Sequence, residues 1–311
     1  MTVLLLRLAG PLQSWGVKSR FTVRATELAP TKSGIIGMLA AAVGRRRTDP
    51  IEDLLSLRFG VRKDQPGRVI RDFHTARTLD GKTSMPLSDR YYLADAVFLA
   101  GIEGDRALLE GLDEALRHPF FPLYLGRRSC PPTHPVSRGL REAGLLDALR
   151  AEPWLAAQWF QQWFHRKYRG RPFDAEMLLD QEVVQEAALP AQERGAVRGS
   201  RDVPASFDPR RRDYGFRQVE QLTARVRAGP ARPHGRTVGR CARPHGRTVG
   251  RRPRPHGRAG GGEPVFLTKI DLDPARRLAR KYLGSPQVMH AVVLRATGGD
   301  DGDGPGRVLW R

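Results

Sequence analysis

The sequence is poor in cysteine and contains no long apolar run. Its 311 residues include only two cysteines, Cys130 and Cys241, and no CxxC spacing. This argues against a disulfide scaffold and a structural zinc site, and it fits a reduced, cytoplasmic compartment. The apolar run at residues 3–6 is too short for a secretion signal, and Arg7 interrupts it. No stretch approaches the length of a membrane span, so we expect no membrane contact.

Acidic residues are outnumbered by basic ones. The chain has 53 lysines and arginines against 33 aspartates and glutamates, which gives a formal net charge of +20. Such an excess predicts a polyanionic partner. Residues 227–262 contain ten arginines and no acidic residue, so they supply half of this charge. The rest of the chain is therefore basic, but less so than the total suggests.

Residues 227–262 also contain a repeat with few apolar side chains. The segment ARPHGRTVGRC at 231–241 recurs as ARPHGRTVGRR at 242–252 and partly as PRPHGR at 253–258. Such a segment cannot bury enough surface to offset the entropy of ordering it, so we predict a disordered linker over 226–263. Its arginines should bind nucleic acid nonspecifically. Its three histidines would have to converge from a flexible segment, so we expect no bound metal and no cofactor.

Residues 1–225 alternate between strand and helix patterns. Residues 2–8 predict a buried strand, and a helix comes next that Thr31 or Ser33 caps and Gly44 ends. Further expected elements are strands at 57–63, 69–77 and 94–100, a loop or hairpin tip at 80–90, and a helix at 105–117. This order is compatible with a ferredoxin-like βαββαβ unit.

Two later segments complete this part of the chain. Residues 140–168 look helical and crowd six large apolar side chains together: Trp154, Leu155, Trp159, Phe160, Trp163 and Phe164. We expect a packing helix, and the alternative is an aromatic surface for a partner subunit. Residues 206–216, SFDPRRRDYGF, predict a strand and turn with an arginine cluster.

The segment YLGRRSCPPTHP at 124–135 is the strongest candidate for a binding loop. Gly126 permits a tight turn or a close approach to another chain, and the three prolines stiffen the second half of the segment. The guanidinium groups of Arg127 and Arg128 and the hydroxyl of Ser129 suit a phosphate backbone. The alternative is a surface loop whose arginines pair with local carboxylates.

A helix start near the N-terminus is a second candidate anion site. Thr31, Lys32 and Ser33 combine helix-terminal amides with a full positive charge. Simple capping would explain the two hydroxyls equally well.

The segment GPLQSWGVKS at 10–19 superficially suggests a nucleotide-binding P-loop. Val17 separates Gly16 from Lys18, and this spacing excludes the motif. We expect this loop to bury Trp15 and to present Lys18 and Arg20 to RNA or a partner.

The expected strand at 69–77 carries Arg71, His74 and Arg77. His74 is either a general acid or base or a hydrogen-bonded structural residue. Tyr91 and Tyr92 either stack on unpaired bases or pack in the core.

Four stretches in this order resemble the CasD family, the fifth Cas protein family in its type I-E form: LLLRLAGPLQSWG, PTKSGIIGMLAAAVG, RDFHTA and YLGRRSCPPTHP. The resemblance covers residues 1–225. CasD is a subunit of Cascade, the CRISPR RNA-guided surveillance complex of antiviral defence. The resemblance implies a RAMP domain with an RRM-like ferredoxin fold and a protruding β-hairpin "thumb", for which residues 68–92 are the candidate.

The same resemblance implies a non-catalytic subunit that binds the 5′ handle of mature CRISPR RNA. The implied partners are a CasC-type backbone subunit, a CasA-type large subunit and, through the complex, target DNA. The candidate RNA-binding residues are Lys18, Arg20, Thr31, Lys32, Ser33, Arg71, Arg77, Gly126, Arg127, Arg128 and Ser129.

Two other readings remain open. A related type I-C form cleaves the CRISPR RNA precursor without metal, and His74, Arg90 and Tyr91 are the candidate set for such an endoribonuclease. The third reading is a fusion remnant that folds but does not assemble.

Residues 264–311 resemble a different family, the opening part of the CasE CRISPR RNA endonuclease. His290 ends a PxxMH motif and matches a histidine that takes part in RNA cleavage in that family, but Gln287 stands where a tyrosine is common. We expect a truncated ferredoxin-like fragment without activity, left when two neighbouring coding regions were joined.

Overall fold

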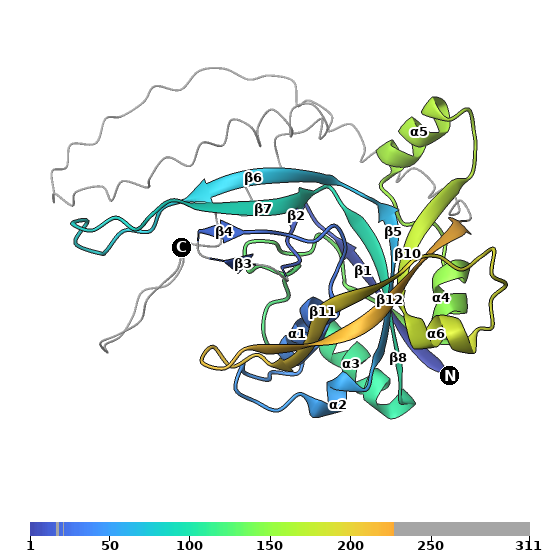
Figure 1. Cartoon of the computed structure of the whole chain (residues 1–311), viewed down its shortest axis with the longest axis horizontal. Coiled ribbons are helices and arrows are strands. Elements are labelled where there is room, and N and C mark those ends of the chain that lie inside the picture. Colours follow the sequence, from blue (N-terminus) through green and yellow to red (C-terminus); the bar gives the residue numbers. More distant parts are fainter. Residues whose placement is uncertain (17–18, 21, 227–311) are drawn as a thin grey trace, which may run out of the picture. The chain divides into compact units, whose positions relative to one another are not determined.

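A seven-stranded antiparallel sheet organises the part of the chain that the computed structural model describes, which is residues 1–16, 19–20 and 22–226 (Figure 1). In spatial order its strands are β11 (Val197–Ser206), β12 (Asp213–Val226), β10 (Phe173–Asp180), β5 (Arg58–Gln65), β8 (Val97–Gly104), β1 (Thr2–Ala9) and β9 (Ser137–Glu142). These residues belong to the compact unit Met1–Val238. The predicted linker, the CasE-like fragment and His290 lie outside the described residues.

Four of these strands and two helices have the predicted βαββαβ order. Helix α1 (Lys32–Ala42) connects β1 to β5, α3 (Arg106–Arg117) connects β8 to β9, and the four strands lie in the order β5-β8-β1-β9. Thr31 caps α1 by accepting from the Gly34 amide at 3.2 Å. Gly44 comes after the helix with a φ of 84°, so the predicted start and end of this helix are confirmed.

Strand β1 is apolar along almost its whole length because both faces of the sheet are covered there. Leu4, Leu6 and Leu8 pack in the cluster that contains the buried residues of α1 and α3. Val3 and Leu5 pack on the opposite face, against α4 (Leu145–Ala151) and α6 (Gln181–Glu186). The alternation of side chains along the strand therefore serves two cores.

Strands β5 and β8 continue into a long exposed hairpin made of β6 (Arg68–His74) and β7 (Ser88–Ala94), which extends from the body in Figure 1. The ribbon bends at Gly67, where φ is 71° and a Cβ would lie 2.6 Å from the Ala94 carbonyl oxygen. The strand predicted over 69–77 ends at His74, and the one predicted over 94–100 is divided at Asp95, whose φ is 57°.

A second sheet forms where this hairpin meets the N-terminal segment. Strand β7 pairs with β2 (Leu12–Gln13) and β4 (Val23–Arg24), and β4 pairs with β3 (Ser19–Arg20). Trp15 is buried, as predicted for the loop that resembles a P-loop. The short helix α2 (Glu52–Leu55) precedes β5.

The helix predicted over 140–168 is wrong in detail. Residues up to Glu142 form β9, and the rest forms α4 and α5 (Gln158–Lys167) with a break at Pro153. Trp154 in the break is buried and stacks on Phe173 at 4.5 Å. The packing role is thus carried by Trp154, while α5 itself has no fully buried residue.

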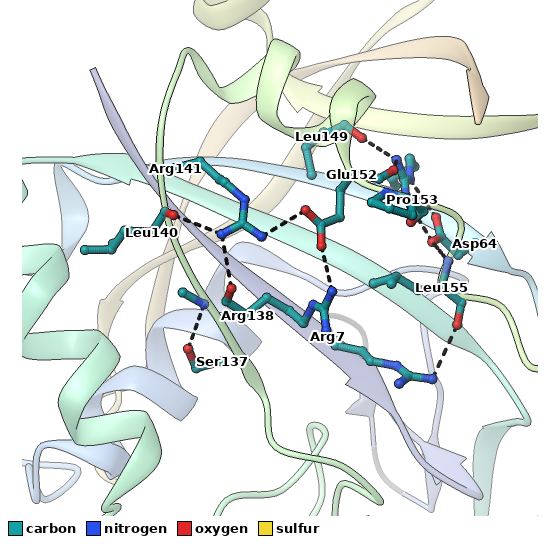
Figure 2. Close-up of polar contacts among 12 residues, drawn as sticks. Arg7, Asp64, Ser137, Arg138, Leu140, Arg141, Leu149, Glu152, Pro153 and Leu155 are labelled. Atoms are coloured by element: carbon teal, nitrogen blue, oxygen red, sulfur yellow. Dashed lines mark hydrogen bonds and ion pairs between the residues drawn. The ribbon is translucent and has the colours of Figure 1, made fainter. Parts of the chain in front are cut away.

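A fully buried arginine explains the break. Arg62 forms a two-pronged pair with Asp64, at 2.7 and 3.0 Å. Its other donors reach the carbonyl oxygens of Leu149, Glu152 and Pro153. These carbonyls lie at the end of α4, where they have no partner within the helix. Neighbouring contacts hold Glu152 between Arg138 and Arg141, at 2.8 and 3.0 Å (Figure 2).

The Arg62 contacts predict a large loss of stability in Arg62→Ala. This change leaves the Asp64 carboxylate buried without its cation, which costs about 3–5 kcal/mol in comparable pairs. We expect urea denaturation, monitored by tryptophan fluorescence, to show this loss. The control is Arg106→Ala, whose exposed pair with Glu110 should contribute less than about 1 kcal/mol. Equal midpoints for both variants would contradict the assigned role.

Candidate nucleic-acid interface

The loop predicted to bind phosphate packs closely against the N-terminal segment. Gly126 has a φ of 85°, and a Cβ there would overlap the carbonyl oxygen of Ser14. The Ser14 amide donates to the Leu125 carbonyl at 3.0 Å, and the Leu125 amide donates to the Cys130 carbonyl at 2.7 Å. The tight turn predicted at Gly126 is confirmed, and its close approach is to the N-terminal segment of the same chain, which requires glycine.

Arg127 has a structural role. Its guanidinium donates to the carbonyl oxygens of Tyr91 and Arg24, at 3.2 and 2.7 Å. It also lies 4.7 Å from the centre of the Tyr92 ring. Arg127 therefore joins β4 to β7, and its contact with RNA stays a prediction. The alternative expectation for Arg127, a pair with a local carboxylate, is wrong, because its partners among the described residues are backbone carbonyls.

Arg128 and Ser129, in contrast, are exposed. Arg128 has no ion-pair partner among the residues that the structure describes. Its guanidinium is thus the one that this loop presents to solvent. The Ser129 hydroxyl makes only a weak contact with the thiol of Cys130, at 3.9 Å.

The predicted anion site at the start of α1 is occupied by the protein itself. The amide of Lys32 donates to the carboxylate of Asp202 at 2.8 Å. The Lys32 ammonium lies 3.5 Å from the Asp180 carboxylate and is almost completely buried. Thr31 and Ser33 are buried as well. The helix terminus does bind an anion, which is the Asp202 carboxylate of β11. The Lys32 ammonium is buried beside Asp180, so it is not available to RNA.

Arg217 completes this buried cluster. It donates to both oxygens of Asp202, at 2.8 and 3.0 Å, and also pairs with Asp180. Burial would raise the pKa of Asp202, but the hydrogen bonds and charge of Arg217 outweigh it and lower this pKa. The pair therefore stabilises the fold above the ordinary pKa of aspartate, and this contribution is lost as pH falls through the lowered value.

The hairpin β6–β7 does not assemble the candidate endoribonuclease residues. In its register Asp72 lies opposite Arg90, and Arg71 lies opposite Tyr91. Because side chains alternate along a strand, His74 and Arg90 lie on one face and Tyr91 lies on the other. His74 contacts Asp72 at 2.6 Å, and Arg71 pairs with Asp89 at 2.9 Å. The proposed base and tyrosine are thus on opposite faces of the ribbon.

Arg24 and Arg90 form a pair of cations that the sequence analysis did not recognise as an RNA site. They are register partners in the parallel pairing of β4 with β7, so their side chains share a face. The Nε atom of Arg90 is buried and has no hydrogen-bond partner in the described part of the chain. Asp72 lies opposite Arg90 on the same face and contacts His74, and neither Arg24 nor Arg90 forms an ion pair with a carboxylate in the described part of the chain. Tyr92, two residues beyond Arg90, shares this face and contacts Arg127, so the loop at 126–129 lies beside the pair.

The remaining candidate residues are placed less specifically. Arg77 is exposed near the hairpin tip, where its backbone forms an isolated bridge with Ser84. Lys18 lies outside the described residues, and of Arg20 only the backbone is described, in β3. Among the described residues there is no cluster of three or more potential metal ligands. None of the described helices is both long and apolar enough to span a membrane.

The contacts of Arg127 and Arg128 predict that alanine at position 127 lowers the stability of the fold and alanine at position 128 does not. Arg127→Ala removes charged hydrogen bonds to two strands, each of which contributes about 1.5–3 kcal/mol in comparable cases. We expect a clear drop in thermal unfolding temperature, measured by circular dichroism. Arg128→Ala should unfold like the wild type because its side chain is solvated. A greater loss of stability in Arg128→Ala would refute this assignment.

Comparisons with other proteins identify the family of this chain. A family model described as "CRISPR-associated protein (Cas5)" matches residues 3–220. The Cascade subunit CasD of Escherichia coli (strain K12) is 36% identical over 161 residues, which are 45% of this chain and 71% of the relative. Two solved structures match with TM-scores of 0.53 and 0.56. The first, described as a Cas protein, is 40% identical and covers 73% of this chain and 99% of its own. The second, from a CRISPR RNA-guided surveillance complex, is 33% identical and covers 74% of this chain and 95% of its own. Because the family match spans well over half of the sequence, the chain belongs to the CRISPR-associated Cas5 protein family.

Proposed function

We propose that this chain is a non-catalytic RNA-binding subunit of a type I-E Cascade complex. In this role it holds the 5′ handle of mature CRISPR RNA and caps one end of the backbone in the cytoplasm. The similarity to a Cascade subunit and to a chain of an RNA-guided surveillance complex supports this proposal.

The observation that carries the RNA-binding role is the paired guanidinium groups of Arg24 and Arg90. Two cations side by side repel each other, and Asp72 on the same face is paired with His74 and forms no ion pair with either arginine, so a phosphate between the arginines would relieve this repulsion. Arginine binds phosphate through a planar fork of donors. Arg128 and Ser129 in the adjacent loop supply a further fork and a hydroxyl. The mechanism is therefore recognition by fixed donors.

The exposed hairpin β6–β7 is suited to be the thumb that a neighbouring subunit contacts. Five apolar side chains on the hairpin and its connecting loop are more than half exposed: Val69, Phe73, Leu79, Met85 and Leu87. Apolar side chains exposed to water do not stabilise the hairpin itself, and a group of them marks a surface that binds another protein. We assign this surface to the CasC-type backbone subunit, which leaves Arg24 and Arg90, on the face of the hairpin opposite to Phe73, for RNA.

The cation pair predicts that Arg24→Ala/Arg90→Ala/Arg128→Ala weakens binding of a single-stranded RNA that carries the 5′ handle. We expect about a tenfold loss in affinity at moderate salt. The slope of log affinity against log salt should flatten by about 2, since each lost phosphate contact contributes about 0.7. Fluorescence anisotropy over a salt series measures both quantities.

A matched control removes three exposed arginines in and after the aromatic helix, Arg166, Arg169 and Arg171. These side chains carry the same charge but lie at the C-terminal end of α5 or after it, and not on β4, β7 or the loop at 126–129. Equal losses in the two triple variants would show that only net charge matters and would reject the site.

Incubation of the wild type with precursor RNA in EDTA should leave the RNA intact. Specific cuts that His74→Ala abolishes would replace this proposal with endoribonuclease activity.

The exposed apolar residues predict a separate effect on assembly. Replacing Phe73, Leu79, Met85 and Leu87 by serine should abolish co-purification with the CasC-type subunit. RNA affinity of the isolated chain should change less than about threefold, because the cation pair is untouched. A wild-type chain that fails to co-purify would identify a non-assembling remnant.

A further inference from the structure

The hairpin β11–β12 is held rigidly at its base and extends beyond the sheet. Asp202 on β11 is fully buried beside Arg217 on β12, and both contact the start of α1 or its neighbours. Phe207, next to the turn, packs against the first core cluster. The residues beyond this anchor are therefore presented in a defined orientation.

The outer face of this hairpin carries an exposed aromatic ring next to an arginine. Because side chains alternate along β12, Phe216 faces away from the buried Arg217. Phe216 is 73% exposed, and the Arg201 guanidinium lies 5.8 Å from its ring centre. Arg201 is oriented by a 3.0 Å hydrogen bond to the Tyr214 carbonyl. Within the described part of the chain, no core contact accounts for a phenyl ring held in water at this position.

The turn of the hairpin adds three consecutive exposed arginines, Arg210, Arg211 and Arg212. Asp208 is used by the turn itself, since its carboxylate accepts from the Arg210 amide at 2.8 Å. None of these three guanidinium groups, nor that of Arg198, has a carboxylate partner in residues 1–16, 19–20 and 22–226. Asp213 lies 3.6 Å from Arg201 and leaves the others unneutralised.

We propose that this outer face of β11–β12 is a second binding site for single-stranded RNA, with Phe216 stacking on an unpaired base and the turn arginines contacting phosphates. Aromatic rings combined with a cationic groove are the usual means of binding a single strand. Three adjacent arginines without carboxylate partners in the described part of the chain give this face a local positive charge, which suits the phosphates of a nucleic acid.

The RNA already held at the first site is the assigned occupant, so this inference rests on the proposed function. Hairpins β6–β7 and β11–β12 both extend to the left in Figure 1. A strand bound at one hairpin is present at a high effective concentration for the other. The second site therefore binds RNA that continues beyond the segment held near Arg24 and Arg90.

The test uses the full chain and two RNAs that share the 5′ handle, one short and one extended by unpaired nucleotides. Arg210→Ala/Arg211→Ala/Arg212→Ala should weaken binding of the extended RNA about tenfold and flatten its salt slope by about 2. Phe216→Ala should weaken it about tenfold with an unchanged slope, and Phe216→Tyr should restore it. Binding of the short RNA should stay the same in every variant.

The control is again the Arg166, Arg169 and Arg171 triple alanine variant. If the hairpin variants bind the extended RNA like this control, the second site is refuted while the first site stands. If the hairpin variants instead lose affinity for both RNAs equally, the hairpin belongs to the first site and this inference is wrong. A wild-type chain that binds neither RNA overturns the proposed function and the inference together.

Discussion

The arrangement of the domain depends on one hydrogen bond, which the Lys32 amide at the start of α1 donates to the carboxylate of Asp202. It ties β11 to a helix that lies about 170 residues earlier in the chain. Arg217 and Asp180 extend the contact to β12 and β10, and Asp180 also accepts from the Phe59 amide of β5. Charges in such a buried cluster must be matched, because each unpaired ion would cost several kcal/mol. The cluster therefore sets the position of hairpin β11–β12 relative to the βαββαβ unit.

The same need for matched partners separates structural arginines from available ones. Arg62, Arg127 and Arg217 have their donors filled by carbonyls or carboxylates, so they hold elements together. Arg90 and Arg128 have no such partners among the described residues. In a chain of net charge +20, this distinction identifies the cations that are free to meet a polyanion better than the charge itself does.

The two hairpins give the domain two separate exposed surfaces. Hairpin β11–β12 lies at the edge of the seven-stranded sheet, hairpin β6–β7 continues from β5 and β8 into the second sheet, and each projects polar or apolar side chains that the core does not use. The rigid sheet positions these extensions in the way that a scaffold positions functional loops. Membership of the Cas5 family places this architecture among CRISPR-associated proteins, and the exposed surfaces give the contacts that assembly and RNA binding would require.

Local features were determined by the sequence alone. The strand at the N-terminus, the Thr31 cap and the need for glycine at Gly126 depend on neighbouring residues and backbone geometry, so they were predicted correctly. The partners of Lys32, Arg62 and Arg127 were decided only by the tertiary structure, because they come from residues far away in the chain. An arginine in the sequence does not show whether its guanidinium will bind a backbone carbonyl or a phosphate. Only the folded chain shows which donors are already occupied.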